Sequence, residues 1–292
     1  MTTKDFLTSL IQIAKSDLAA SKLLFTNGFY LQSTFYLQQG VEKGNKAFAI
    51  FNDFIKADEI KHIGHDHIEL HKRGINFQLE NLKILNNNSI ETKEFLDTIL
   101  SHTNIDHKGY IKSLENSRDI KNEWQKFKVV EIDAVELAEL IEEIDFEIEE
   151  PANSSKDTKD DLVKQLKEKV QEFILPLFHK LKEKYPQIDI DEIDTFFNDS
   201  NNKDALAHTM LDFVEYLRKF IPAFHKMYIL GFILYPLVSK VRYPDFGEGF
   251  DPIQTFTTDH PLINQQPRLH KLASNSVEVL EVIMQQSVRQ LS

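Results

Sequence analysis

Histidines gather in one short stretch of the chain, where four of the 11 lie within ten residues of one another. They are His62, His65, His67 and His71. Residues four apart on a helix share a face, so His67 and His71 have the spacing to bind one metal ion. Asp66 and Glu69 would add oxygen ligands. The alternative is that His65 and Asp66 only begin a helix and that the other histidines are solvated. We favour this alternative and assign no metal ligand.

A polar face on a predicted helix over residues 29–52 is the second place with the residue types for chemistry. Its members are Gln38, Gln39, Glu42, Lys43 and Lys46. Such side chains can line a nucleotide pocket between helices, or they can simply face water. Both glutamines lie beside the apolar Leu37 and Val41, which predicts that the face is partly buried. We take Gln39, Lys43 and Lys46 as candidate nucleotide-binding residues.

A charged turn nearer the C-terminus is the third such place. Arg242 and Asp245 stand at the two ends of an Arg-Tyr-Pro-Asp sequence. Arg242 has the chemistry to hold a phosphate, because a guanidinium stays charged and its donors match phosphate oxygens in pairs. It can equally pair with Asp245 and fix the direction of the turn. We favour the structural interpretation and keep Arg242 among the candidate nucleotide-binding residues.

Composition excludes several classes of site. The 292 residues include no cysteine, which removes disulfides, thiolate zinc sites, iron–sulfur clusters and cysteine nucleophiles. No phosphate-binding glycine loop, G-x-S-x-G or H-E-x-x-H pattern occurs, and we expect no cofactor. No apolar run approaches the roughly 18–20 residues of a membrane helix, and the first residues do not resemble a secretory signal. We therefore expect no membrane association and a cytoplasmic location.

The net charge of −12 weighs against a sequence-independent binder of nucleic acid, but this charge is unevenly distributed. Residues 131–150 carry ten acidic side chains and no Lys or Arg. The other 272 residues hold 34 basic and 36 acidic side chains, a sum of −2. The remaining surface can therefore still present a local basic groove.

The elements that must position these residues are predicted to be helices. Glycine and proline are scarce, at 9 each, and apolar residues recur at helical spacing, so we predict an all-α fold. Long helices are predicted over residues 5–26 and 29–52. The short turn between them implies an antiparallel hairpin. A loop over 53–65 follows, and then a helix that begins near His65 and ends at Gly74.

The second half of the chain is predicted to be helical as well. The acidic residues 131–150 form the solvent side of an amphipathic helix, and the polar residues 151–161 are the best candidate for a linker. Further helices are predicted over 190–198, 202–241 and 268–291. The last of these is amphipathic and needs a partner face.

Two parts of the sequence resemble the HEPN family, which consists of small α-helical domains found as toxins, as partners of nucleotidyltransferases and in defence systems. The residues that carry the resemblance follow the order of the family's motifs. They are Asp17, Leu18 and Ala20; Gln38, Gln39, Glu42, Lys43, Lys46 and Ala47; His65, Asp66 and Leu70; and Arg242, Tyr243, Pro244 and Asp245. The resemblance implies a HEPN-like antiparallel bundle built from residues 1–85 and 202–292, with a helical insertion over 86–201. It also implies a homodimer.

Many active members of the family are metal-independent ribonucleases that carry an Arg, four to six residues and then a His on one helix. Arg218 and His225 match that spacing, with six residues between them. The resemblance implies that Arg218 holds a phosphate and that His225 moves a proton. Lys219 stands where active members carry a small polar residue, and Pro222 is expected to kink or break the helix. The alternative is a surface arginine and a packed histidine.

The resemblance therefore implies that the chain engages RNA or a nucleotide in a toxin–antitoxin or defence setting, as a metal-independent endoribonuclease or together with a nucleotidyltransferase-type partner. Tyr228 lies one residue off the position at which such toxins are modified with AMP, and we assign it no role. The alternative is a non-catalytic module that binds a nucleotide or a protein between its helices. The acidic helix over 131–150 would then be its docking face or a mimic of nucleic-acid charge.

Overall fold

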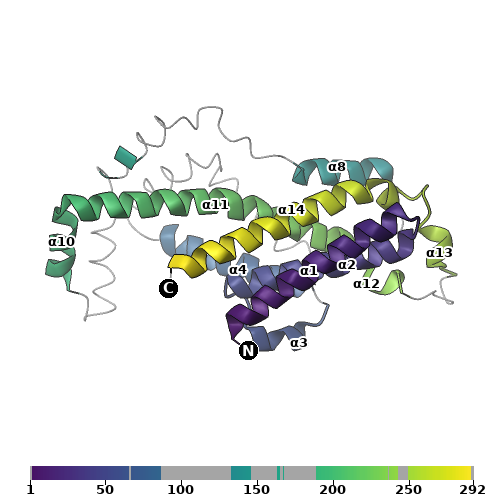
Figure 1. Ribbon diagram of the computed structural model, residues 1–292, viewed down its shortest axis with the longest axis horizontal. Helices are drawn as coiled ribbons and strands as arrows, with labels where there is room; N and C mark the ends of the chain where they lie inside the picture. The colour runs from purple at the N-terminus through teal and green to yellow at the C-terminus, as the bar shows by residue number, and fades with distance from the viewer. Residues whose placement is uncertain are drawn as a thin grey trace. The chain divides into compact units, whose positions relative to one another are not determined.

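The computed structural model describes residues 2–65, 67–86, 133–145, 163–164, 167, 189–235, 237–242 and 249–290. The regular elements of these residues are helices and include no strand, which confirms the predicted all-α helical bundle (Figure 1). The chain divides into two compact units. The first consists of residues 1–78, 114–147 and 220–292, and the second consists of residues 79–113 and 148–219.

The first unit begins with a helical hairpin. α1 spans Thr3–Thr26 and α2 spans Tyr30–Phe51, both within two residues of the predicted bounds. α1 starts at a capping box, in which the Thr2 hydroxyl accepts from the Asp5 amide and the Asp5 carboxylate accepts from the Thr2 amide. Gly28 turns the chain with φ at +79°, which suits a residue without a Cβ. The two helices then pack against each other, as predicted.

Glycines on α2 let neighbouring helices approach closely. A Cβ at Gly40 would lie 2.7 Å from Cγ of Leu18 on α1. A Cβ at Gly44 would lie 2.5 Å from Cε of Met227 on α11, a helix that spans Ser200–Leu234. Both glycines are buried. Because α2 also contacts α1, α12 (Leu237–Lys240) and α14 (Pro261–Gln290), it is the central helix of this unit.

Aromatic rings fill the interface between α2 and the part of α11 that belongs to the first unit. The Phe48 ring stacks on Phe220 and Phe224, with centroids 4.7 and 5.0 Å apart. Phe54 packs against Phe224 and against Phe77 of α4, which spans His67–Asn86. These contacts give the abundant phenylalanines a structural role, because each ring buries a large apolar area.

The C-terminal helix closes the first unit. α14 spans Pro261–Gln290 and packs against α1 and α2. α8, which spans Ala134–Ile144, lies on α14 and buries three apolar side chains completely. They are Leu137, Ile141 and Ile144. An ion pair of 3.0 Å between Arg268 and Asp145 adds a polar contact. The N- and C-terminal segments thus fold together as one unit.

Glycine was a misleading signal for the end of one helix. α4 continues through Gly74, where the sequence predicted its end, and runs to Asn86. A Cβ at Gly74 would lie 2.8 Å from the Phe54 ring, so this glycine permits close packing instead of ending the helix. The predicted loop before α4 also contains two short helices, η1 over Ala57–Glu59 and α3 over Ile60–Ile63.

Proline positions also differ from the predicted boundaries. α11 continues through Pro222, because packing of Phe220 and Phe224 on Phe48 holds both sides of that proline in one helix. α11 ends at Leu234, and the separate α12 spans Leu237–Lys240, where one helix to residue 241 was predicted. α14 begins with Pro261 as its first residue, a position that needs no amide donor, and not near 268 as predicted.

The second unit contains α10, over Ile190–Asn198, which has the predicted bounds. The carboxylate of Asp189 caps it by accepting from two backbone amides. In the same unit Lys167 pairs with Asp204 at 2.6 Å. The predicted linker over 151–161 lies outside the described residues. The predicted domain boundaries near 85 and 201 stay predictions.

Candidate functional site

Glu42 is a buried carboxylate in the middle of α2, with 5 % of its side chain exposed. Its Oε1 lies 2.6 Å from Nζ of Lys46, one helical turn away. Its Oε2 accepts a hydrogen bond of 3.1 Å from Gln38 and lies 2.8 Å from Nδ1 of His65. Because an ionised carboxylate only accepts, Nδ1 of His65 carries a proton. A buried carboxylate is costly unless it is paired and hydrogen-bonded, and these contacts satisfy both conditions.

A second ion pair extends these contacts to α1. Nζ of Lys43 lies 2.7 Å from Oδ2 of Asp17 and donates to Oε1 of Gln39 at 3.0 Å. Gln39 donates to Oε1 of Gln38 at 2.6 Å, so the glutamines join the two ion pairs. We call the seven residues the α2 charged network. They are Asp17, Gln38, Gln39, Glu42, Lys43, Lys46 and His65.

The predicted nucleotide-binding face on α2 is therefore balanced by charges within the protein. Each of its two lysines contacts a carboxylate, Lys43 that of Asp17 and Lys46 that of Glu42. Gln38 is almost fully buried, which confirms the predicted partial burial of this face. A phosphate would have to compete with an internal carboxylate for either lysine. A nucleotide-binding role of Gln39, Lys43 and Lys46 stays a prediction.

Arg242 follows α12 and is exposed. Its guanidinium carbon lies 5.0 Å from the centroid of the Phe35 ring on α2, which is the geometry of a cation–π contact. Asp245 lies outside the described residues, and so does the predicted pair between Arg242 and Asp245. Arg242 as a phosphate contact also stays a prediction.

The proposed catalytic pair lies on α11. Arg218 belongs to the second unit and His225 to the first, and the helix is continuous between them. His225 is half-buried. The side chain of Arg218 lies outside the described residues, so the catalytic pairing stays a prediction. Tyr228 is buried and its ring lies 4.5 Å from that of Phe232, an edge-on contact that gives it a packing role.

The histidine cluster is only partly described. His62 is exposed on α3, and His65 contacts Glu42. Asp66 and the side chains of His67 and His71 lie outside the described residues. Within the described residues, no group of three or more His, Asp or Glu side chains is placed to hold a metal ion.

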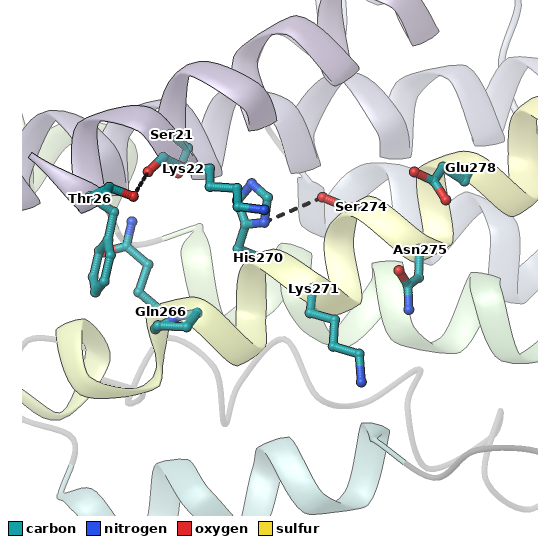
Figure 2. A pocket seen from close by; sticks show the side chains of 11 residues that line it. Ser21, Lys22, Thr26, Gln266, His270, Lys271, Ser274, Asn275 and Glu278 are labelled. Carbon is teal, nitrogen blue, oxygen red and sulfur yellow. Dashed lines mark hydrogen bonds between the residues drawn. The ribbon is translucent and has the colours of Figure 1, made fainter.

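A pocket that the sequence did not reveal lies between α1 and α14 (Figure 2). We call it the α1–α14 pocket. Its volume of about 550 Å³ is typical of small-molecule sites. Both helices contribute polar side chains to its lining. The lining residues are Ser21, Lys22, Phe25 and Thr26 of α1, and Gln266, Pro267, His270, Lys271, Ser274, Asn275 and Glu278 of α14.

Buried polar groups fix one end of this pocket. The Ser21 hydroxyl donates to the carbonyl of Ser33 at 2.9 Å, and the Ser33 hydroxyl donates back to the carbonyl of Ser21 at 2.7 Å. Gln266 donates to the Ser33 hydroxyl at 2.5 Å and accepts from Thr34 at 3.3 Å. These bonds join α1, α2 and α14 and hold the pocket wall in place before any ligand binds.

His270 forms the middle of the pocket wall. Its Nε2 donates to the carbonyl of Leu18 at 2.7 Å, and its Nδ1 lies 3.5 Å from the Ser274 hydroxyl. Burial lowers the pKa of His270, the hydrogen bond to Leu18 opposes that effect, and the charge of Lys22 lowers the pKa further. The ring is therefore neutral near pH 7 and stands beside an ammonium group. Figure 2 shows Lys22 reaching from α1 toward His270, while Lys271 extends from α14 away from α1.

Sequence reasoning missed this pocket because its two walls are far apart in the chain. Ser21 and Lys22 lie about 250 positions before His270 and Lys271. The polar residues of each helix look like an ordinary solvated face. Only the amphipathic character of the last helix was visible in the sequence.

Residues 7–105 of the chain match the model of the HEPN domain family. The match includes α1, α2 and α4, and all seven residues of the α2 charged network lie within it. No curated protein and no solved structure shows a significant match to the chain. Of the helices that the structure describes, none combines the length and apolar character needed to span a membrane.

Proposed function

From the match of residues 7–105 to the HEPN domain family, we propose that the chain engages RNA or a nucleotide and cleaves RNA without a metal ion, in a toxin–antitoxin or defence setting. The observation that carries the proposal is the family match over residues 7–105, which indicates an RNA- or nucleotide-related function at the level of the family. The finer statement, cleavage, depends on Arg218 and His225.

Each member of this pair has a distinct chemical role in the proposal. The guanidinium of Arg218 holds the phosphate at the cleavage point, because it stays charged and donates in pairs. His225 takes the proton of the ribose 2′-hydroxyl or gives one to the leaving oxygen, because an imidazole titrates near neutral pH. Both residues lie within the bounds of α11, seven positions apart in the sequence, as the proposed Arg–His pattern requires.

Total RNA in the presence of EDTA provides the test. We expect the protein to cleave it and the Arg218→Ala/His225→Ala double variant to be at least roughly 100-fold slower. His208→Ala is the matched control, because His208 is an exposed histidine of the same helix, and it should keep full activity. Equal cleavage by the protein and the double variant would contradict the assigned residues.

A non-catalytic module is the second candidate, and two observations favour it. The lysines of α2 are already neutralised by internal carboxylates. α8 presents an exposed acidic face that includes Glu136, Glu139 and Glu142, which suits a basic partner. Negligible cleavage by both the protein and the double variant would favour this candidate.

The proposed setting is cytoplasmic and includes a homodimer or a nucleotidyltransferase-type partner. In a homodimer, two Arg–His pairs would flank one RNA strand. Light scattering after gel filtration tests this directly, because the dimer has twice the mass of the 34.0 kDa chain. A monomer at micromolar concentration that still cleaves RNA would contradict the paired arrangement.

A further inference from the structure

The α1–α14 pocket carries positive charge that the protein does not neutralise. Lys22 lines it from α1 and Lys271 from α14, and both residues are exposed. Neither lysine forms an ion pair within the part of the chain that the structure describes. Lys43 and Lys46 of the α2 charged network differ, since each contacts a carboxylate. The pocket lysines are therefore available to an anion from solution.

The acidic residue of the pocket lies at its other end. Glu278 follows Lys271 on α14 by about 10 Å along the helix axis. A hydrogen bond to Glu281 raises the pKa of Lys15, and the charge of Glu278 adds to that effect. Glu278 thus lies near a cation of its own. The end that holds Lys22 and Lys271 keeps its positive charge, although the chain as a whole is acidic.

The remaining walls suit a small organic molecule. Phe25 and Pro267 present apolar surface, while Ser274 and Asn275 present a hydroxyl and an amide. The imidazole of His270 is held by the carbonyl of Leu18 and supplies a rigid wall between these parts. A ligand with an anionic group, hydroxyl groups and an apolar face finds a matching surface for each part.

We propose that the α1–α14 pocket binds a small phosphomonoester, with its phosphate on Lys22 and Lys271 and its organic part against Phe25 and Pro267. A phosphomonoester carries close to two negative charges at neutral pH and so matches two lysines. Lys22 is the principal contact, and the long side chain of Lys271 reaches the phosphate by changing rotamer. The pocket volume of about 550 Å³ accommodates a sugar phosphate or a mononucleotide, but not a folded RNA.

The pocket is separate from the proposed cleavage residues, because neither Arg218 nor His225 lines it, and for a nucleotide ligand the inference rests on the nucleotide engagement of the proposed function. Phosphomonoester binding and RNA cleavage can be tested separately, and either proposal can fail without the other. Loss of phosphomonoester binding would leave the RNA cleavage assay unchanged, and loss of RNA cleavage would leave phosphomonoester binding unchanged.

Isothermal titration calorimetry tests the proposal. The full chain is titrated separately with AMP, ribose 5-phosphate, inorganic phosphate and adenosine. We expect at least one of the two esters to bind at submillimolar concentration and adenosine, which has no phosphate, to bind at least tenfold more weakly. Tighter binding of AMP than of ribose 5-phosphate identifies a nucleotide as the natural class, and the reverse order identifies a sugar phosphate. Absence of ester binding, or binding of inorganic phosphate alone, overturns the proposal.

Variants locate the binding on the protein. Lys22→Ala and Lys271→Ala should each weaken ester binding, Lys22→Ala by roughly tenfold or more, because each removes a charged donor. Lys4→Ala is the matched control, since Lys4 is an exposed lysine of α1 that does not line the pocket. Unchanged melting temperatures show that the variants are folded. Ester binding that is equal in the Lys22→Ala and Lys4→Ala variants overturns the proposal.

Discussion

The α2 charged network and the α1–α14 pocket hold similar residues in different electrostatic settings. Both contain two lysines and at least one histidine. In the network each lysine contacts a carboxylate, and Glu42 is buried. In the pocket the lysines are exposed and make no ion pair among the described residues. The comparison teaches that similar residue types can be neutralised within the protein in one region and left available to solvent in another.

The largest effect is expected from the hub of the network. Glu42→Gln removes the charge that pairs with Lys46 and leaves that ammonium buried without its partner. We predict a loss of about 3–5 kcal/mol in the free energy of unfolding, measured by urea denaturation. Glu278→Gln in the pocket is the matched control and should change it by less than about 0.5 kcal/mol. A similar small change in both variants would show that the network contributes little to stability.

A double variant sharpens the same point. Glu42→Gln/Lys46→Met removes both charges together, so no ammonium is left buried without its carboxylate. We predict that the double variant is more stable than Glu42→Gln alone, with an interaction energy of about 1–3 kcal/mol in the double-mutant cycle. If the loss of stability in the double variant equals the sum of the losses in Glu42→Gln and Lys46→Met, the contact between Glu42 and Lys46 contributes no coupling energy.

His270 of the α1–α14 pocket should make the free energy of unfolding depend on pH below about 6.5. The groups that face His270 are Lys22 from α1 and Ser274 from α14, together with the carbonyl of Leu18. Because the folded pKa of His270 is lowered, the unfolded chain binds a proton at a pH where the folded protein does not. Stability is therefore lost as the pH falls below about 6.5, the usual pKa of histidine, and is regained above it.

His270→Gln tests this directly, because glutamine keeps a donor for the Leu18 carbonyl and does not titrate. We predict that the free energy of unfolding of this variant falls less steeply between about pH 6.5 and 5. His62→Gln, which changes an exposed histidine of α3, serves as the control. A slope that is the same in the protein and in His270→Gln would contradict the assignment.

The smallest effect is expected from the pocket lysines themselves. Lys22→Ala and Lys271→Ala should each change the free energy of unfolding by less than about 0.5 kcal/mol, because both are exposed and make no ion pair in the described part of the chain. Lys43→Ala, which leaves Asp17 without its cation, should cost more than either. Equal losses in the three variants would remove the distinction between the network and the pocket.

Local signals predicted most of the helices, and long-range contacts explain the exceptions. The bounds of α1 and α10 follow from capping residues and apolar spacing, and α2 follows from apolar spacing after the turn at Gly28, all of which act within a few turns of chain. Gly74 and Pro222 suggested helix ends, but each lies inside a helix that aromatic packing holds together. Whether a glycine ends a helix or admits a ring depends on a neighbour that lies elsewhere in the chain.

In the candidate sites, too, some features could be predicted from neighbouring residues, while others depend on contacts between helices. Gln38 beside Leu37 and Val41 was enough to predict that the polar face of α2 is partly buried. The pairing of Lys43 with Asp17 requires α1 to pack on α2 and could not be predicted from the spacing on α2. The HEPN resemblance was likewise visible from short motifs, and the family match over residues 7–105 agrees with it.

The amino-acid sequence alone determined that this chain is helical, that its first two helices form a hairpin and that its N-terminal part is similar to the HEPN family. These properties depend on the spacing of residues close together along the chain. Tertiary structure decided that Lys43 is neutralised, because its carboxylate, Asp17, comes from another helix, whereas Lys46 pairs with Glu42 one turn away on α2 at a spacing that the sequence already shows. It also decided that α1 and α14 enclose a pocket, since neither helix has one until the two are packed together.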